Sequence, residues 1–430
     1  MESGNYLRSL LLPWILSGLF LSASLVHAEA SRSFDVVIDD EITINILSLP
    51  ATGDKLLLWF PSGPGFVEQE KHAAVKLAAK GIEVWFADLL SAWFLPTLPS
   101  SMDKLPASEL ADFIEAVREK SNKQIMLVAN GRGALPVLRA ARKWKQRYGA
   151  SAGLSGVILI SPNLYVSTPE PGMEGEYMPV ARYSNLPIFI IQPANSPWRW
   201  KLKQTVSSLS AGGSDVYAWV LANIRDRFYF RPDAMADEDR QAGRLSYYLL
   251  NAGRLLGSFN QTLRGVRTGH DIPVVERSQK KERTLRAYTG NPSPPALQLK
   301  NLQGNNVDLS NYRDKVVLVN FWASWCPPCV HEMPSMQRLS DRLSGKPFEI
   351  LAVNMAEDDN TVKKFLQEKV NVRFTILMDR EGKALTRWKV FAFPTSYVIG
   401  KKGKIRLALF GAIDWMQDDV LLKINRLMDE

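Results

Sequence analysis

The sequence predicts an α/β protein made of a parallel-sheet unit followed by a second α/β unit, and three observations support this. Short apolar runs typical of strands alternate with helical patterns between residues 34 and 231. A second alternation of the same kind begins near residue 294. Such alternation is typical of mainly parallel sheets covered by helices. Between the two units, residues 290–295 read GNPSPP, which suits neither a helix nor a central strand and so marks a boundary.

Composition supports a globular protein with more than one domain. The chain has 430 residues, of which 46% are hydrophobic and 23% charged. Its net charge of +9 is partly concentrated in residues 264–291, which contain seven Lys and Arg residues but only three acidic residues. No aromatic residues interleave with these bases as a stacking surface for nucleic acid would require, so no nucleic-acid partner is predicted. A solvated linker, which can rest near anionic lipid headgroups, is the better interpretation of this basic stretch.

The N-terminus has the pattern of a secretory signal peptide over residues 1–28. A short start containing Arg8 precedes an apolar run over residues 9–26, which ends in a small-x-small pattern at Ala28. An uncleaved membrane anchor is the alternative, but Pro13 and Gly18 inside the run favour removal. A lipid anchor is excluded because no cysteine stands at the cleavage site. We therefore expect an exported chain cleaved near Ala28.

The first unit, residues 34–231, is expected to contain six strands with helices between them. The strand-like runs are residues 55–60, 82–89, 124–129, 156–161, 188–193 and 216–221, and helical patterns cover residues 70–79, 108–120 and 135–148. The segment 232–293 is expected to be a helical and basic linker. The second unit, residues 294–430, contains strand-like runs at residues 315–322, 348–355, 374–379, 395–400 and 405–411.

The second unit holds both cysteines of the chain, Cys326 and Cys329, between a buried-strand pattern and a helical one. A Cys-x-x-Cys turn in a strand–turn–helix context is typical of a redox-active dithiol. Only a thiolate attacks a disulfide, and the unpaired N–H groups and dipole of a helix N-terminus favour the anion of Cys326. Cys329, one turn further on, can then resolve a mixed disulfide at Cys326. Pro327 and Pro328 suit the first helical turn and stiffen the loop.

Three other interpretations of the cysteines are weaker. A structural zinc site needs four ligands, and the chain has only four histidines, one of them in the predicted signal peptide, so no metal site is expected. Two inert buried thiols would not explain the flanking prolines. A peroxidase of the peroxiredoxin type would place Pro and Thr where Val319 and Ala323 stand.

Residues 296–339, including the run NFWASWCPPCVHEMP, strongly resemble the entry segment of TlpA-like thioredoxin-fold proteins of the ResA and cytochrome c maturation types. The resemblance extends through residues 377–405 and covers the second unit. It implies a thioredoxin fold with an added hairpin over residues 297–310. It also implies a Gram-negative bacterial host, in which the exported protein would be periplasmic.

The resemblance also implies the remaining site residues. Phe393, Pro394 and Thr395 would form the cis-proline loop facing the cysteines, where free backbone groups pair with a client strand. Glu332 would lie near the thiols and shuttle the proton of Cys329; the alternative is an ordinary first-turn glutamate favoured by the helix dipole. Trp325 would shield the sulfurs.

The first unit contains a hydrolase-like motif without its nucleophile. The run VANGRGALP follows a strand and opens a helix, as the nucleophile elbow of α/β-hydrolases does, and FPSGPG (residues 60–65) resembles an oxyanion-hole loop. Gly131 stands where serine is expected, Asn195 where the acid is expected, and residues 225–227 where the histidine is expected. The resemblance therefore implies a non-catalytic hydrolase-like domain that binds a partner or merely spaces the redox unit. A hydrolase using Ser62 or Ser196 would lack a base, since His72 and His270 are poorly placed for that role.

Taken together, these patterns predict an exported thiol–disulfide oxidoreductase acting as a reductase, with Cys326 attacking and Cys329 resolving. Its partners would be a disulfide-containing exported client protein and an external, membrane-bound dithiol donor, and no cofactor is expected. Two alternatives stay open: a client-binding protein whose inactive first domain recruits a specific partner, and a disulfide oxidant, since the sequence does not fix the direction of electron flow.

Overall fold

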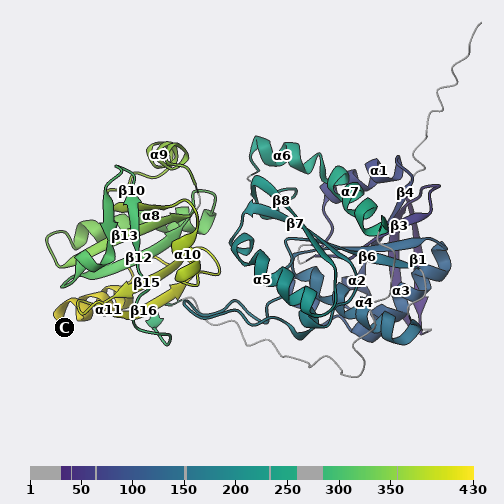
Figure 1. The fold of residues 1–430 in the computed structure, drawn as a ribbon, viewed down its shortest axis with the longest axis horizontal. Helices are drawn as coiled ribbons and strands as arrows, with labels where there is room; N and C mark the ends of the chain where they lie inside the picture. The colour runs from purple at the N-terminus through teal and green to yellow at the C-terminus, as the bar shows by residue number, and fades with distance from the viewer. Residues whose placement is uncertain are drawn as a thin grey trace, which may run out of the picture.

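The computed structural model describes residues 31–430 except 40, 63–64, 150–152, 232–233, 259–283 and 356. Two eight-stranded sheets, each with its own helices and core, make up this part of the chain, and they form the two bodies seen in Figure 1. The expected signal peptide lies outside the described residues. None of the described helices is long and apolar enough to cross a bilayer.

The sheet of the N-terminal unit is parallel over six strands and begins with an antiparallel hairpin. Its strand order is β1-β2-β4-β3-β5-β6-β7-β8. The hairpin β1–β2 joins the parallel part through the antiparallel pair β2–β4. The strands are β1 (Arg32–Ile38), β2 (Ile42–Leu49), β3 (Lys55–Trp59), β4 (Ile82–Ala87), β5 (Gln124–Asn130), β6 (Leu154–Ile160), β7 (Ile188–Asn195) and β8 (Val216–Arg225). Every residue of β6 is buried, as expected for a central parallel strand.

Helices cover both faces of this first sheet. The helices are α1 (Glu68–Ala78), α2 (Leu89–Ala92), α3 (Ala107–Ser121), α4 (Ala134–Tyr148), α5 (Pro197–Ala211), α6 (Ala236–Ala242) and α7 (Leu245–Ser258), with short 3₁₀ turns at Pro99–Asp103, Gly131–Gly133 and Pro179–Arg182. One apolar cluster joins α3 and α4 to one face, and a second joins α1 and α7 to the other.

Part of the segment expected as a linker belongs to the N-terminal unit. In α7, Leu249 and Leu256 are buried in the same cluster as Ile158 of β6 and Phe189 of β7. In α6, Glu238 is fully buried and its carboxylate accepts hydrogen bonds from the Arg225 guanidinium at the end of β8. These two helices therefore complete the first core, beyond the boundary that the sequence suggests.

The sheet of the C-terminal unit has the order β11-β10-β14-β13-β12-β15-β16-β9. Its centre, β14-β13-β12, is parallel, and β15 and β16 continue it antiparallel. The strands are β9 (Arg286–Ala287), β10 (Gln298–Asn301), β11 (Asn306–Asp308), β12 (Val316–Trp322), β13 (Phe348–Met355), β14 (Thr375–Asp379), β15 (Thr395–Ile399) and β16 (Ile405–Phe410). The added hairpin expected from the resemblance is β10–β11. The short β9, from the expected linker, pairs with β16 at the sheet edge.

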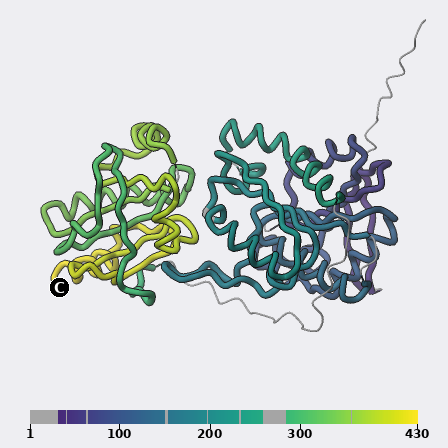
Figure 2. The backbone as a smooth tube through the Cα atoms, viewed as in Figure 1, coloured from purple at the N-terminus to yellow at the C-terminus, as the bar shows by residue number. Residues whose placement is uncertain are grey.

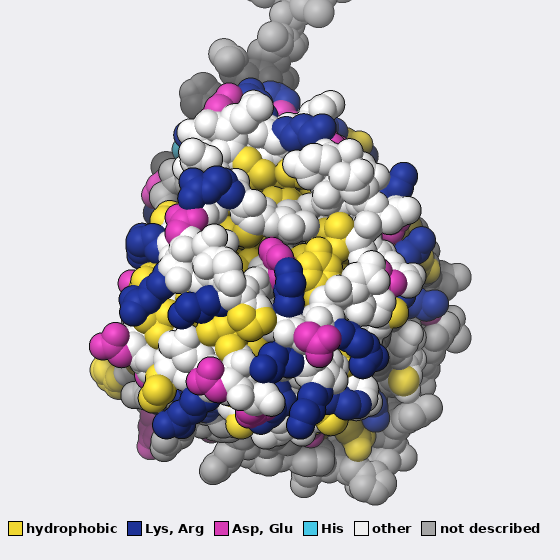
Figure 3. Space-filling view, turned by 90° about the vertical axis from the view of Figure 1, so that its left-hand side faces the viewer, with side chains coloured by type: hydrophobic (Ala, Val, Ile, Leu, Met, Phe, Trp, Pro, Cys, Tyr) yellow, Lys and Arg dark blue, Asp and Glu magenta, His cyan; other side chains and the backbone are white. Residues whose placement is uncertain are grey.

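The helices of the C-terminal unit are α8 (Pro327–Arg342), α9 (Asp359–Glu368), α10 (Lys383–Arg387) and α11 (Asp418–Asp429), with a 3₁₀ turn at Leu309–Tyr312. Buried residues of α8 and α11 pack on one face of the sheet, and α10 packs on the other. Figure 3 views the molecule from the side of this unit and shows Lys and Arg interspersed with Asp and Glu, densest toward its lower edge. Mixed charge of this kind fits a solvated surface.

Candidate active site

The two cysteines lie where β12 ends and α8 begins, and they form a disulfide. Cys326 is the N-cap residue of α8, and the backbone N–H of Cys329 donates a hydrogen bond to its sulfur at 3.3 Å. Cys326 is 6% exposed, whereas Cys329 is fully buried. Cys326 is therefore the more exposed of the two cysteines.

The helix N-terminus supplies a field that favours a negative charge on Cys326. Its sulfur accepts the N–H of Cys329, which is the single N–H group among the first three helical residues, at the positive end of the helix dipole. Pro327 and Pro328 occupy this turn, and their missing N–H groups leave no helical bond unmade. These features lower the free energy of the thiolate in the reduced protein.

Glu332 lies one turn after Cys329 and is only 2% exposed. One carboxylate oxygen accepts a hydrogen bond from the Asn320 side chain at 2.8 Å, and the other accepts one from the Trp415 indole at 3.3 Å. Burial raises the pKa of Glu332 to about 7, although these hydrogen bonds pull it the other way. An exposed first-turn glutamate would instead have a lowered pKa. Glu332 can therefore gain and lose a proton near neutral pH.

Asn320, in the middle of β12, is a support for Glu332 that the sequence analysis missed. Its side-chain amide donates both to Glu332 and to the Ser396 hydroxyl on the neighbouring β15. Ser335 adds to the same network, because its hydroxyl accepts the backbone N–H of Trp415. A single asparagine inside the apolar run KVVLVNFW was the available signal, since a buried amide needs partners.

The cis-proline loop lies before β15, and the Phe393–Pro394 peptide bond is cis. The Pro394 carbonyl accepts the backbone N–H of Gly411 at 2.9 Å, so this group is already paired within the unit. Thr395 is 2% exposed, and its hydroxyl donates to the Ala392 carbonyl at 2.7 Å. The Thr395 side chain is thus buried inside the loop and is not exposed for contact with a substrate.

Phe393 is a residue of this loop with free backbone groups. Among the described residues, neither its N–H nor its carbonyl makes a hydrogen bond. Its ring meets the Trp325 ring edge-on, with centroids 5.8 Å apart, and both side chains are partly exposed. Trp325 and Phe393 therefore lie side by side where the strand-to-helix turn meets the cis-proline loop.

A second buried acid, Glu357, holds the turn that leads into the cysteines. Its carboxylate accepts the Ser324 backbone N–H at 2.8 Å and the Asn354 side-chain amide at 2.7 Å, and also the Ser324 hydroxyl. Burial raises the pKa of Glu357 above its usual value. Nothing in the sequence pattern distinguishes this residue, because it follows β13 in a loop and meets Ser324 only through the fold.

Comparison with known proteins shows which family the C-terminal unit resembles. The AhpC/TSA family matches residues 290–408. The thiol-disulfide oxidoreductase ResA of Geobacillus kaustophilus (strain HTA426) is 38% identical over 119 residues, which cover 28% of this chain and 68% of that protein. The ResA of Geobacillus thermodenitrificans (strain NG80-2) matches with the same identity and the same coverage.

The chain belongs to the ResA-type thiol–disulfide oxidoreductases. The matched region is the C-terminal unit, which we call the thioredoxin domain from here on. Among solved structures, a protein described as a thiol:disulfide interchange protein of the DsbE type from Chlorobium tepidum is 30% identical. That match covers 32% of this chain and 96% of the other, with a TM-score of 0.30.

The N-terminal unit of this oxidoreductase contains a sharp turn at Gly131, between β5 and α4. Gly131 has φ of +53°, a conformation that side chains other than glycine adopt rarely. A Cβ at this position would meet no atom within 4 Å. The turn is therefore open above Gly131, and only backbone strain opposes a larger residue there.

Asp226, at the end of β8, takes the place where the sequence motif would require a histidine. Its carboxylate accepts the hydroxyls of Ser161 at 2.8 Å and of Ser196 at 2.5 Å. Burial raises the pKa of Asp226 to about 6. Ser196 also caps α5 by accepting the Trp198 N–H. These contacts give Ser196 a structural role, and none of them involves a histidine.

A buried polar chain lies beside the Gly131 turn. The Asn130 amide donates to the Tyr229 hydroxyl, which in turn donates to Glu70 at 3.1 Å. Burial raises the pKa of Glu70 to about 7. Ser62, the other candidate nucleophile, donates its hydroxyl to the Gly65 carbonyl at 3.1 Å. No histidine takes part in either set of contacts.

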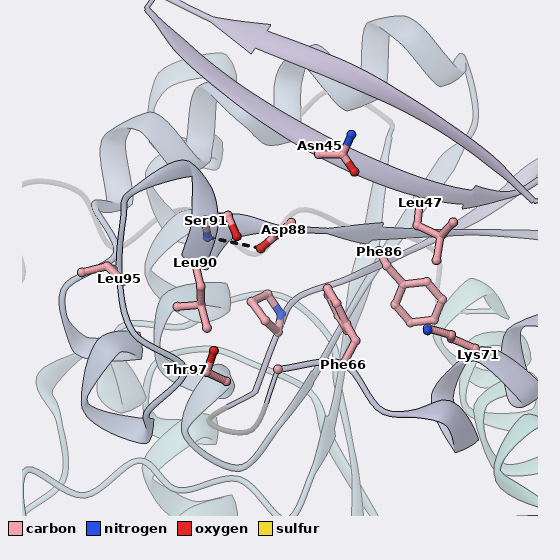
Figure 4. A pocket seen from close by; sticks show the side chains of 12 residues that line it. Asn45, Leu47, Phe66, Lys71, Phe86, Asp88, Leu90, Ser91, Leu95 and Thr97 are labelled. Atoms are coloured by element: carbon pink, nitrogen blue, oxygen red, sulfur yellow. Dashed lines mark hydrogen bonds between the residues drawn. The ribbon is translucent and has the colours of Figure 1, made fainter.

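One pocket of about 370 Å³ opens beside the loop that follows β3. Figure 4 shows the rings of Phe66 and Phe86 on one side of it and Leu90 and Thr97 on another. Asp88 accepts the backbone N–H of Ser91 at its rim. Its lining mixes apolar and polar groups, and it lies away from the cysteines. Among the described residues, no cluster of His, Cys, Asp and Glu is arranged to hold a metal ion.

Proposed function

We propose that this protein is an exported reductase that opens disulfides of periplasmic client proteins through Cys326 and Cys329. The observation that carries the proposal is the asymmetry of the pair. One sulfur is reachable at a helix N-terminus, and the other is buried one turn before a carboxyl group whose pKa is about 7. This asymmetry suits one nucleophilic and one resolving thiol.

In the proposed reaction the reduced protein gives two electrons to the client. The Cys326 thiolate attacks one sulfur of the client disulfide, and the other client sulfur leaves as a thiolate. Cys329 then loses its proton and attacks the Cys326 sulfur, which releases the second client sulfur. The client leaves as a dithiol, and the protein is left with the Cys326–Cys329 disulfide that the structure contains. A dithiol donor returns the pair to the reduced form.

Glu332 is proposed as the group that accepts the proton of Cys329. A buried thiol needs a nearby base, because burial disfavours its anion. Glu332 lies on the same helix, and its position is fixed by Asn320 and Trp415. It can take the proton when the resolving step begins and release it afterwards.

The cis-proline loop is proposed as the place where the client backbone binds. The unpaired N–H and carbonyl of Phe393 can form a short two-bond ladder with an extended client segment. The rings of Trp325 and Phe393 would lie against the client side chains next to its disulfide. Pro394 keeps the loop turned toward the sulfurs, and Thr395 supports it from inside.

The partners and the location follow from the same proposal. The client is a disulfide-containing exported protein, and the electron donor is a membrane-bound dithiol protein. Residues 1–28, outside the described part of the chain, would direct export and be removed. The chain has no further cysteine, so electrons entering at this pair can leave only to another molecule.

The equilibrium reduction potential of the pair decides between a reductase and an oxidant. We expect a value near about −270 mV, as in thioredoxin, or lower. Equilibration of the mature protein with glutathione buffers, followed by thiol alkylation and mass measurement, gives this value. A potential near about −120 mV would make the protein an oxidant and reverse the proposed direction of electron flow.

A second candidate function is that the N-terminal unit recruits a specific client without catalysing anything itself. The turn at Gly131 between a strand and a helix supports its likeness to a hydrolase whose nucleophile has been lost. Asp226 and its two serine partners occupy the region where such an enzyme needs histidine. A glycine cannot attack a carbonyl.

Restoring only the nucleophile should not restore hydrolysis. The variant Gly131→Ser has room for its side chain but adds about 1 kcal/mol of backbone strain. We expect the variant to fold, and both variant and wild type to leave p-nitrophenyl acetate unhydrolysed above the buffer rate. Ester hydrolysis by the wild-type protein, saturating with substrate, would contradict the view that this unit is inactive.

A further inference from the structure

The N-terminal unit is attached to the thioredoxin domain by specific contacts as well as by the chain itself. The indole N–H of Trp200, in α5, points to the sulfur of Met355 at the end of β13, 3.1 Å away. Its ring lies so close to Gly382 that a Cβ there would be 2.6 Å from the indole. Figure 1 shows α5 on the side of the N-terminal unit that faces α10. Trp200 thus packs into the apolar cluster that contains Trp388.

A second contact surrounds Phe391, two residues before Phe393. The Tyr165 ring meets the Phe391 ring edge-on at 5.2 Å, and the ammonium group of Lys201 lies 4.3 Å from its centroid. Phe391 and Lys201 are both buried. A cation over an aromatic face is attractive, and more so when water is excluded. Tyr165 and Lys201 of the N-terminal unit therefore pack against the segment that leads directly into the cis-proline loop.

A long loop of the N-terminal unit, residues 163–178, which we call the arm, completes the contact. Figure 2 shows the arm extending from the N-terminal unit to the thioredoxin domain. Two of its glycines permit close approach: a Cβ at Gly172 would be 2.1 Å from the Tyr288 hydroxyl, and one at Gly175 would be 2.6 Å from the Phe391 ring. Glu174, between them, pairs with Lys389 at 3.4 Å.

Two of these contacts, at Met355 and at Phe391, lie toward the edge of the thioredoxin sheet that carries the cysteines, whereas the contact with Tyr288 lies toward the opposite end of the strands. The parallel strands β12, β13 and β14 all end at this edge, and Met355 is the last residue of β13. Cys326 follows the end of β12, which is adjacent to β13, and adjacent strands are about 4.8 Å apart. The contact with Phe391 lies on the other loop that borders the thiol site. The N-terminal unit therefore stands at this edge on the face covered by α10, next to the loop that holds Phe393.

We propose that the docked N-terminal unit is a wall of the client site and selects clients by shape. The inference rests on the reductase function proposed above. A disulfide in a short, flexible and extended segment can lie along Phe393 and reach Cys326. A disulfide on the surface of a compact folded protein meets the N-terminal unit first and is held away from the sulfur.

The test is to undock the unit without touching the thiol site. Trp200→Ala removes the indole from Met355, and Gly175→Leu forces a side chain into the space that Phe391 and Tyr165 fill. Trp219→Ala is the matched control, because this tryptophan contacts Tyr247 and Tyr248 inside the N-terminal unit. Small-angle X-ray scattering reports docking, and reduction rates are compared for oxidised glutathione and for insulin.

Both undocking variants should increase the radius of gyration and raise the ratio of insulin to glutathione rates about fivefold, with the glutathione rate within twofold of wild type. Trp219→Ala should change neither quantity. If a variant had a larger radius of gyration but an unchanged ratio of insulin to glutathione rates, the N-terminal unit would be only a spacer. That result would overturn the inference and leave the proposed reductase function in place. An unchanged radius of gyration in both variants would overturn the docking itself. If the wild type reduced neither disulfide, the proposed function would fail, and the selection inference with it.

Discussion

The variant Cys326→Ser should lose disulfide reduction by on the order of 1,000-fold or more, because a serine hydroxyl cannot replace the attacking thiolate. Cys329→Ser should also stop turnover, but for a different reason. Its Cys326 still attacks the client, and the mixed disulfide that forms has no resolving thiol. We therefore expect Cys329→Ser, and not Cys326→Ser, to accumulate covalent complexes visible on a non-reducing gel.

The control for this pair is Ser344→Ala, an exposed position after α8 that should keep the wild-type rate. Complexes trapped by Cys326→Ser in place of Cys329→Ser would reverse the assigned order of the two sulfurs. Such a result would also contradict the argument from exposure, since Cys329 is fully buried.

The variant Glu332→Gln should slow the release of the client by about 10- to 100-fold, because the amide cannot accept the proton of Cys329. The rate of the wild type should rise with pH through an inflection near 7, where Glu332 loses its proton. The variant should lack this inflection. Stopped-flow measurement of mixed-disulfide resolution between pH 5 and pH 9 gives both quantities.

Glu332 should also make stability depend on pH in a definite direction. Its folded pKa of about 7 is above its usual value of 4.5, so the folded state binds the proton more tightly. Its contribution to stability is complete below about pH 4.5 and is lost as the pH rises through 7. The difference is on the order of 3 kcal/mol. Chemical unfolding should therefore show Glu332→Gln gaining stability relative to wild type between pH 5 and pH 8.

Glu70→Gln is a matched control for Glu332→Gln. Glu70 is equally buried, and its pKa is also raised to about 7, but it lies in the N-terminal unit beside Tyr229. It should change the pH dependence of stability in the same direction and leave the inflection in the resolution rate in place. If Glu70→Gln removed that inflection, or Glu332→Gln kept it, the proton role of Glu332 would be wrong.

The alternating strands and helices of both units could be predicted because their patterns are local. The run at residues 348–355 coincides with β13, and the thioredoxin hairpin falls at β10–β11. The sequence analysis did not predict the hairpin β1–β2, because its buried apolar residues alternate with exposed ones and do not form a continuous apolar run. The helices α6 and α7 were assigned to a linker, because the burial of α7 depends on Ile158 and Phe189, far away in the sequence.

The candidate site was predictable where one short motif contains it. Cys326, Cys329 and Glu332 lie within two turns of one helix, and the resemblance supplied Pro394, whose preceding peptide bond is cis in the structure. Glu357 escaped notice because its partner Ser324 is 33 residues away and the pairing depends on strand order. The docking contact escaped for the same reason: Trp200 and Met355 are 155 residues apart.

The placement of both cysteines within one helical turn limits how much the stability of the fold depends on the disulfide. A disulfide stabilises mainly by reducing the chain entropy of the unfolded state, and the effect grows with loop length. Here the bond joins residues only three positions apart. The stabilisation is therefore about 2 kcal/mol, against about 4.7 kcal/mol for a 100-residue loop. Domains typically have about 5–15 kcal/mol of stability, so the reduced form should stay folded, with a thermal midpoint lower by about 5–10 °C. The protein can therefore pass repeatedly between its oxidised and reduced forms and remain folded in both.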